Sequence, residues 1–239
     1  MADQGVGVKE GFVKFPRTPH LIWLGETPPR NDKLLDAAAA KELLRHPLSV
    51  EEKMDGANLG LSLATDRRVR AQSRGAYLKV GTAGQWEPLW RWLAARHRTL
   101  AGALGPSLIA CGEWCYARHS TYYDRLPDWF LLFDVYDRDV ERFWSRERRD
   151  SLAREAGLST VPLLTTGTFG LSDLQKLLGD SRFGAADSEG LYLRWDEGDW
   201  LVARAKIVRP GWVMVSDAHW SSWPLKTNRL AADETRESG

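Results

Sequence analysis

The sequence predicts an α+β fold in which antiparallel sheets are flanked by helices. Apolar residues alternate with small or polar ones at residues 59–63 and again at 189–195, which is the pattern of strands with one buried face. Segments rich in Ala, Leu and charged residues separate these strands and are typical of helices. Short polar turns at 66–67 and 196–199 suit antiparallel neighbours. The 239 residues, 43% of them hydrophobic, are enough for one large domain with a sizeable core.

The helices are expected in four segments. Residues 34–45 are rich in Ala, Leu and Lys and end before Pro47, which disfavours helical geometry in the residue ahead of it. Residues 86–100 form a second expected helix. Residues 145–156 form a third, with Ser145 as N-cap and Gly157 as its end. A short fourth helix is expected at 171–178.

The strands carry most of the polar residues of interest. A short strand is expected at 50–53, followed by a strand at 59–63 and a return strand at 69–73. The apolar, aromatic runs at 108–116 and 129–136 are typical of central strands. Segments 189–195 and 200–208 are expected to form a hairpin.

The bulk properties exclude several classes of protein. No run of about 20 apolar residues is present, so no membrane span is expected. The first eleven residues lack the charged start and apolar centre of a signal peptide, which indicates a cytoplasmic protein. Cys111 and Cys115 on one strand would lie about 13 Å apart, too far for a disulfide. We expect one domain at residues 1–230 and a disordered polar tail at 231–239.

Charge alone does not indicate a nucleic-acid binder. The formal net charge is only +1. Basic residues gather around Arg91, Arg96 and Arg98 and in the run at 138–154, but acids and apolar residues are interleaved with them. A solvated helix face explains each group about as well as a phosphate-binding patch does.

Charged residues fall on otherwise apolar strand faces. A four-residue turn at 196–199 would place Glu189 directly opposite Lys206 in the hairpin. A cross-strand salt bridge would account for this pair. Alternatively, a phosphate and its metal ion lie between the two side chains. Glu113 and Asp134 also lie within apolar strands, so several buried acids and bases on different strands point to a polar site lined by sheet.

Lys53 is the candidate nucleophile. It ends a strand and is followed by Asp55 and Gly56, and the glycine permits a tight turn close to a ligand. An unperturbed lysine is almost wholly protonated at neutral pH, so a lowered pKa would be needed. A magnesium ion, Arg74 or Lys206 nearby would favour the neutral amine. For the bare Lys-x-Asp-Gly pattern alone, an exposed turn lysine is the preferred interpretation, because a four-residue pattern often occurs by chance.

The longer string Glu52-Lys53-Met54-Asp55-Gly56-Ala57-Asn58 resembles the first motif of ATP-dependent RNA ligases. These enzymes belong to the covalent nucleotidyltransferases, together with DNA ligases and capping enzymes. Five further segments resemble this family's other motifs in the same order: Gln72-Ser73-Arg74-Gly75, Cys111-Gly112-Glu113-Trp114, Phe133-Asp134, Ser188-Glu189-Gly190-Leu191 and Arg204-Ala205-Lys206. The segment at 15–21 is similar to the one that precedes this domain in several bacterial and phage members. The resemblance covers roughly residues 12 to 215.

The resemblance implies an ATP-grasp-like adenylation domain that carries AMP on Lys53. It implies catalytic roles for Lys53, Arg74, Glu189 and Lys206. It implies metal binding, of Mg²⁺ or Mn²⁺, by Glu113 and Glu189. It also implies that the nucleotide of ATP is bound by Glu52, Asp55, Gly56, Asn58, Arg74, Glu113, Phe133, Arg204 and Lys206. In these roles Glu52 would contact the adenine edge and Phe133 would stack on the base. Asn58 would orient the end to be sealed.

The resemblance has two departures and leaves alternatives open. Arg204 stands where many relatives have lysine. Only 33 residues (239 − 206) follow Lys206, too few for a C-terminal OB-fold domain. We therefore expect RNA, as a nicked duplex or an RNA/DNA hybrid, to be recognised by this domain's own surface or through an end-processing or end-recognition partner. The alternatives are DNA joining, adenylation without sealing, and a catalytically silent nucleic-acid-binding module.

Three residues near these motifs are left without a firm role. His20 and His119 could contact phosphate, although a structural hydrogen bond is the preferred interpretation of His119. Arg118 lies just beyond the Glu113 strand, where it could bind phosphate or face solvent.

Overall fold

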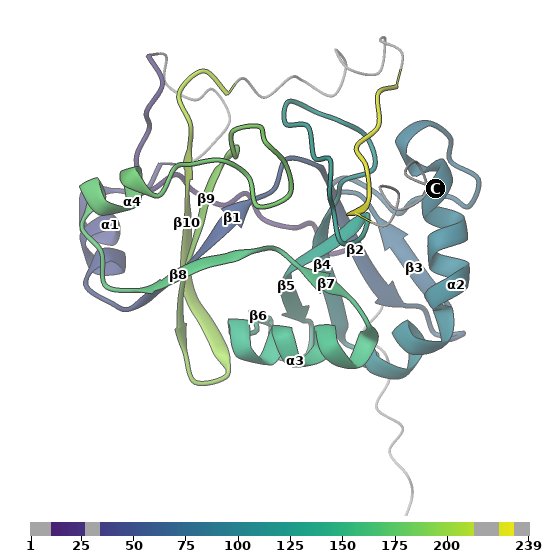
Figure 1. Cartoon of the computed structure of the whole chain (residues 1–239). Coiled ribbons are helices and arrows are strands. Elements are labelled where there is room, and N and C mark those ends of the chain that lie inside the picture. Colours follow the sequence, from purple (N-terminus) through teal and green to yellow (C-terminus); the bar gives the residue numbers. More distant parts are fainter. Residues whose placement is uncertain (1–10, 27–33, 213–224, 232–239) are drawn as a thin grey trace, which may run out of the picture.

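Two antiparallel sheets form the centre of the molecule (Figure 1). A computed structural model describes residues 11–26, 34–212 and 225–231. The first sheet has the order β10-β9-β1-β8, made of β1 (Leu48–Lys53), β8 (Leu163–Gly167), β9 (Gly190–Glu197) and β10 (Trp200–Val208). The second has the order β3-β2-β4-β5-β6, made of β2 (Ala57–Leu63), β3 (Val69–Gln72), β4 (Leu108–Trp114), β5 (Phe130–Asp137) and β6 (Arg142–Phe143). Strand β7 (Ser159–Thr160) pairs in parallel with β5.

Helices cover the outer face of each sheet (Figure 1). Helices α1 (Ala37–Leu44) and α4 (Leu171–Lys176) bury Leu43 and Leu174 against Val50, Leu191 and Leu193 of the first sheet. Helices α2 (Glu87–Ala103) and α3 (Arg146–Ala156) pack on the second sheet, where their apolar residues join those of β2, β4 and β5. A 3₁₀ turn, η1 (Gly84–Trp86), precedes α2. The architecture is therefore α+β with two sheets between helices, as the sequence predicts.

The expected helices and long strands are confirmed, with shifted ends. Helix α1 begins after Asp36, whose side chain accepts a hydrogen bond from Ala39 N at 2.8 Å, so its first turn starts three residues later than expected. Ser145 occupies the N-cap of α3, but its hydroxyl accepts no capping hydrogen bond. The first backbone N–H of the helix, that of Arg146, donates to the carboxylate of Asp196. Gly157 ends the helix in the left-handed region, at φ 64°. The sequence did not predict β6, β7 or β8, which are short and only partly buried.

The expected register of the last hairpin is wrong. Trp200 pairs with Glu197, so the turn contains two residues rather than four. An irregularity between Leu201 and Ala203 then shifts the pairing by one more residue, and Lys206 lies opposite Tyr192 instead of Glu189. The tight turn contains Gly198 at φ 53°. This turn and the strand bulge together account for the change of pairing. Lys206 and Val208 still lie on one face of β10, but the residue directly across from Lys206 is Tyr192 rather than Glu189.

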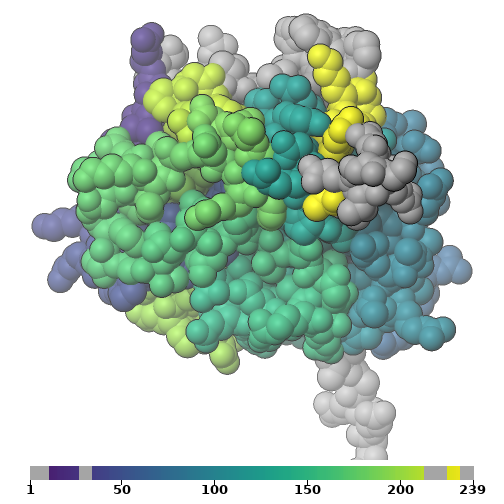
Figure 2. Space-filling model, viewed as in Figure 1, coloured from purple at the N-terminus to yellow at the C-terminus, as the bar shows by residue number. Residues whose placement is uncertain are grey.

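The loop after β4 is held by the last described segment. Arg118 N donates to Lys226 O at 2.8 Å, and Asn228 donates through Nδ2 to the carbonyls of Cys115 and Ala117. Figure 2 shows this segment, in yellow, against the teal loop at the surface. Apart from Ala231, the tail expected at 231–239 lies outside the described residues.

Candidate active site

The end of β1 brings Lys53 to a carboxylate. Lys53 pairs with Gly190, the first residue of β9, and Glu189 directly precedes that strand. The Nζ atom of Lys53 donates to Oε2 of Glu189 at 2.6 Å, and the two side chains are 22% and 8% exposed. A Cβ atom on Gly190 would lie 2.1 Å from the carbonyl oxygen of Ile207, so the close approach of these strands requires glycine. Lys53 therefore lies within a polar site and is not an exposed turn lysine.

The second sheet supplies three polar side chains to the same site. Asn58 on β2 pairs with Glu113 on β4, and Arg74 follows β3. Within the described part of the chain, Nδ2 of Asn58, Oε2 of Glu113 and Nε of Arg74 are buried and have no hydrogen-bond partner. Buried polar atoms without partners cost free energy, and they are typical of sites completed by a ligand or an ion.

The charges of this site act on one another. Burial raises the pKa of Glu113 to about 8, against the lowering effect of the positive Lys53 and Arg74. Burial also raises the pKa of Glu189 to about 7, although Lys53 and Lys206 favour its charged form. Burial lowers the pKa of Lys53, but the negative charges of Glu189 and Glu113 outweigh it, so the net pKa is raised. The lowered pKa expected from the sequence is thus not met, because carboxylates surround the amine.

Lys206 reaches the site from the edge strand β10. Its backbone N–H donates to Pro19 O at 2.9 Å, and its carbonyl accepts from Leu21 N at 2.8 Å. The N-terminal segment thus runs parallel to β10 at this position. Its side chain is 8% exposed and lies close enough to Glu189 to lower that residue's pKa. The structure therefore brings Lys53, Glu113, Glu189, Lys206 and Arg74 together.

The Glu52 carboxylate is hydrogen-bonded to the turn at 181–182. Its carboxylate accepts from Ser181 Oγ at 2.5 Å and from Arg182 N at 2.8 Å. Burial raises the pKa of Glu52, and these hydrogen bonds oppose the effect. The residue that the sequence assigns to the adenine edge thus also ties β1 to the turn at 181–182.

Asp55 and Gly56 shape the chain just after the lysine. The Oδ2 atom of Asp55 accepts from the backbone N–H groups of Ser120 and Thr121, at 2.6 and 2.8 Å. A Cβ atom on Gly56 would lie 2.9 Å from the carbonyl oxygen of Trp114, so only glycine lets the turn pass this close to β4. Both residues fix the loop geometry beside Lys53.

Phe133 and Arg204 lie deeper between the sheets. Arg204 donates through Nη1 to Oδ2 of Asp134 at 2.5 Å. Its guanidinium also lies 4.6 Å from the ring centroid of Phe15 and 4.0 Å from that of Phe143. Phe133 is 7% exposed and meets Phe15 edge to face, with centroids 5.1 Å apart. The contacts of these two residues are with Asp134, Phe15 and Phe143 rather than with the cluster around Lys53.

The residues left open by the sequence now have locations. His119 Nε2 lies 3.2 Å from Oε1 of Gln85, in agreement with a structural hydrogen bond. His20 is buried and meets Trp23 edge to face. Arg118 is exposed, with its guanidinium 5.2 Å from the ring centroid of Tyr122.

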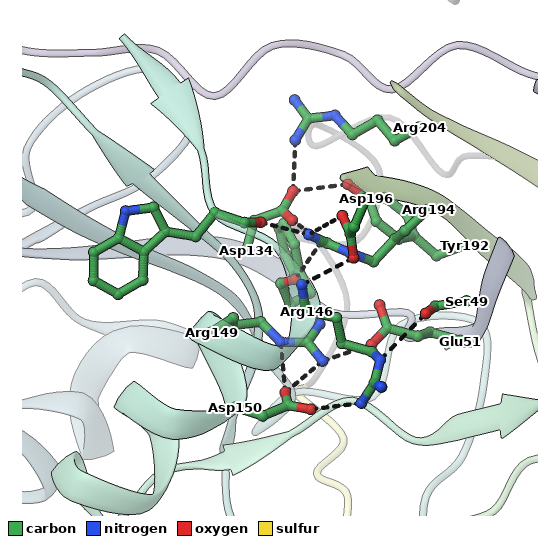
Figure 3. A network of polar contacts seen from close by, with 12 residues as sticks. Ser49, Glu51, Asp134, Arg146, Arg149, Asp150, Tyr192, Arg194, Asp196 and Arg204 are labelled. Atoms are coloured by element: carbon green, nitrogen blue, oxygen red, sulfur yellow. Dashed lines mark hydrogen bonds and ion pairs between the residues drawn. The ribbon is translucent and has the colours of Figure 1, made fainter. Parts of the chain in front are cut away.

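The sequence missed a set of buried ion pairs between the sheets (Figure 3). Glu51, which shares the face of Lys53, pairs with Arg149 of α3 at 2.6 Å. Arg194 of β9 pairs with Asp134 of β5. The signal in the sequence was one arginine in α3, Arg149, and one in the largely apolar strand β9, Arg194. We call Glu51, Asp134, Arg149, Arg194 and Arg204 the interface network.

Two carboxylates are the metal-binding groups that the site offers. In the part of the chain that the structure describes, no group of three or more His, Cys, Asp or Glu residues could hold a metal ion. Mg²⁺ in phosphate chemistry is usually bound by one or two carboxylates together with substrate phosphates and water. Glu113, with its unpartnered Oε2, and Glu189 fit such a shared site, though not a cage made of protein alone.

Comparison with known proteins decides the family. The profile of the RNA ligase family matches residues 46–208, which is more than half of the chain. The chain belongs to the RNA ligase family. Lys53 and the four residues gathered around it all fall within the matched range. No curated protein matches the chain significantly.

Solved RNA ligase structures share the fold. A mutant of the Naegleria gruberi RNA ligase with ATP and Mn superposes with a TM-score of 0.56 at 19% identity, over 81% of this chain and 61% of that one. The same enzyme with PPi gives a TM-score of 0.54 at 19% identity, over 81% and 61%. An archaeal ATP-dependent RNA ligase gives 0.52 at 19% identity, over 82% and 48%. The chain thus spans about three fifths or less of these ligases, and the likeness at this identity shows the fold.

Among the described residues, none of the helices has the length and apolar character needed to cross a membrane.

Proposed function

We propose that this protein is an ATP-dependent RNA ligase that forms a lysyl-AMP on Lys53, transfers AMP to a 5′-phosphate end and seals that end to a 3′-hydroxyl. The contact of Lys53 Nζ with Glu189, inside a partly buried cluster that also contains Glu113, Arg74 and Lys206, carries the proposal. Membership of the RNA ligase family supplies the reaction class.

In the first step, Lys53 attacks the α-phosphorus of ATP. The Lys53 ammonium first separates from Glu189 and gives its proton to the solvent, because only the neutral amine is a nucleophile. An N–P bond then forms while the bond to pyrophosphate breaks. The positive side chains of Lys206 and Arg74 contact the phosphates and stabilise the negative charge that develops on them.

The remaining steps return Lys53 to its free form. A 5′-phosphate oxygen attacks the phosphorus of lysyl-AMP, so the N–P bond breaks and an activated 5′ end forms. The 3′-hydroxyl then attacks the 5′-phosphate, a phosphodiester bond forms and AMP leaves. Asn58 is proposed to donate to the end being sealed, and its Nδ2, which has no hydrogen-bond partner among the described residues, supports this role.

The divalent cation would be held by Glu113 and Glu189 together with phosphate oxygens. When bound, such an ion neutralises phosphate charge and orients the phosphates for in-line displacement. A cation held by these carboxylates would offset the negative charge that raises the pKa of Lys53. Phe133 and Glu52 are proposed for the adenine, and Asp55, Gly56 and Arg204 for the geometry around the nucleotide.

Self-adenylation tests the proposal directly. We expect the protein to become labelled when it is incubated with α-labelled ATP and magnesium, and Lys53→Ala to abolish the label. Lys41→Ala, on the exposed last turn of α1, is the matched control and should retain full labelling. A folded wild-type protein that binds ATP without becoming labelled would contradict the enzymatic assignment and favour a silent nucleic-acid-binding module.

Nicked duplexes then separate sealing from adenylation alone. We expect labelled protein to convert a nick flanked by RNA to a sealed strand, with an AMP-capped 5′ end as the transient species. Accumulation of the AMP-capped end without sealing would indicate an adenylating enzyme. Sealing of all-DNA nicks at equal or higher rate would indicate a DNA-joining enzyme.

A further inference from the structure

The backbone of Phe133 leaves the ladder of its sheet. Between β4 and β5, Cys111 pairs with Asp134 and Gly112 pairs with Leu132, so Phe133 is the extra residue of a bulge. A bulged residue loses its ladder partner, and bulges near active sites commonly redirect a side chain. The carbonyl of Phe133 therefore needs another donor, because it lies in a buried part of the molecule.

Two buried guanidinium groups supply that donor. Arg149 of α3 donates through Nη1 to Phe133 O at 2.8 Å, and Arg194 of β9 donates through Nη1 at 3.1 Å. Arg149 is 1% exposed and Arg194 is fully buried. Figure 3 shows both side chains directed into the space between the sheets, where the carboxylates of Glu51 and Asp134 lie.

Arg149 also contacts the strand of the nucleophile. Its Nη2 donates to Oε1 of Glu51 at 2.6 Å, and Glu51 lies two residues before Lys53 on the same face of β1. A single guanidinium thus joins the bulge of β5 to the strand that ends at Lys53. The planar, rigid fork of arginine can hold two acceptors at a fixed spacing, which a lysine ammonium on a flexible stem cannot do as well.

We propose that Arg149 is a positioning residue for ATP: it holds the bulge that presents Phe133 at a fixed place relative to Lys53. This inference rests on the proposed ligase function, with Phe133 as the residue that meets the base. Arg149 itself lies on α3, away from the motif segments, and the sequence alone gave it no role beyond a charged helix.

A double substitution separates positioning from stability. In Glu51→Leu with Arg149→Met, the ion pair is replaced by apolar side chains of similar size, a change that is often neutral for stability. The hydrogen bond to Phe133 O at 2.8 Å is lost at the same time. We expect the folded double variant to bind ATP at least fivefold more weakly, and its KM for ATP in self-adenylation to rise by a similar factor while the rate at saturating ATP falls less.

Binding is measured by calorimetry with ATP and magnesium in the Lys53→Ala background, so that no chemistry occurs. Arg149→Lys retains the positive charge beside Glu51 and covers the case in which the double variant does not fold. We expect it to lose ATP affinity as well, because the two-acceptor geometry is lost. Arg146→Met is the matched control: Arg146 contacts Ser49 and Asp150 of the same region rather than Phe133, and its loss should leave ATP affinity unchanged.

Wild-type ATP affinity in a folded double variant, or in Arg149→Lys, would overturn the inference and leave the network a structural feature. If the Lys53→Ala protein with an intact network does not bind ATP, the proposed function itself fails instead. The two failures are therefore distinguishable.

Discussion

At the scale of single residues, the site combines charges that are unfavourable in isolation. Glu113 is partly buried, its buried Oε2 atom has no hydrogen-bond partner among the described residues, and desolvation raises its pKa to about 8. A folded protein usually avoids such a group. Its presence beside Lys53 and Glu189 indicates that the site is arranged for a ligand and not for the stability of the free protein.

Glu113→Gln should separate stability from activity. The amide removes a buried acid that lacks full compensation, so we expect a melting temperature equal to or above that of the wild type. We also expect self-adenylation to fall at least about 100-fold, because a carboxylate proposed to bind the metal ion together with the phosphates is lost. Thermal denaturation and label incorporation measure the two effects. Glu155→Gln on an exposed position of α3 should change neither. A variant with full activity would remove Glu113 from the proposed site.

At the scale of elements, the position of Lys53 depends on how closely β1, β9 and β10 approach. Gly190 lies opposite both Lys53 and Val208, in the centre of these three strands. Glu189 enters the site because the backbone at Gly190 leaves no space for a side chain. The glycine of the Glu-Gly motif is thus a packing requirement of the sheet.

Gly190→Ala is expected to destabilise the protein by more than about 2 kcal/mol, because the new methyl group would overlap a backbone carbonyl that cannot move aside easily. Urea denaturation measures the change. Gly102→Ala is the opposite case: its Cβ meets nothing within 4 Å and it lies in α2, so we expect a gain of about 0.5–1 kcal/mol. Equal stability of the two variants would contradict this account of the strand packing.

At the scale of the whole molecule, buried charges join the two sheets. Asp134 of the second sheet accepts hydrogen bonds from Arg194 and Arg204 of the first and from the hydroxyl of Tyr192. Burial alone raises the pKa of Asp134, but the two positive charges and the hydrogen bonds outweigh it, so the net pKa lies below the ordinary 3.8. The candidate active site draws its residues from the same two sheets, with Lys53 on the first and Glu113 on the second.

The lowered pKa of Asp134 predicts a specific acid sensitivity. Its stabilising contribution is present above the unfolded-state pKa of about 3.9 and is lost as the pH falls through the lower folded-state value. Asp134→Asn lacks this contribution and removes the carboxylate that Arg194 and Arg204 share, so we expect a cost of about 3–5 kcal/mol near pH 6. The difference from the wild type should shrink below about pH 4. Denaturant unfolding between pH 3 and pH 7 measures it, and a pH-independent difference would refute the assignment.

The local elements and the motif residues could be predicted from the sequence. The alternation of residues 59–63 and the composition of 145–156 depend on neighbours along the chain, so β2 and α3 were found where expected. Lys53, Glu113, Glu189 and Lys206 stand in short strings of fixed order, and the structure brings them together with Arg74. The α+β class and the family follow from the same strings.

Only the tertiary structure decided the partners of these residues. The register of β9 and β10 depends on a two-residue turn and a bulge. The sequence predicted neither feature, so it wrongly paired Glu189 with Lys206. The raised pKa of Lys53 comes from carboxylates that arrive from β4 and from the start of β9. Arg149 meets Glu51 and Phe133 across the space between the sheets. Such contacts join residues far apart in sequence, and chain neighbours carry no information about which buried charges will meet.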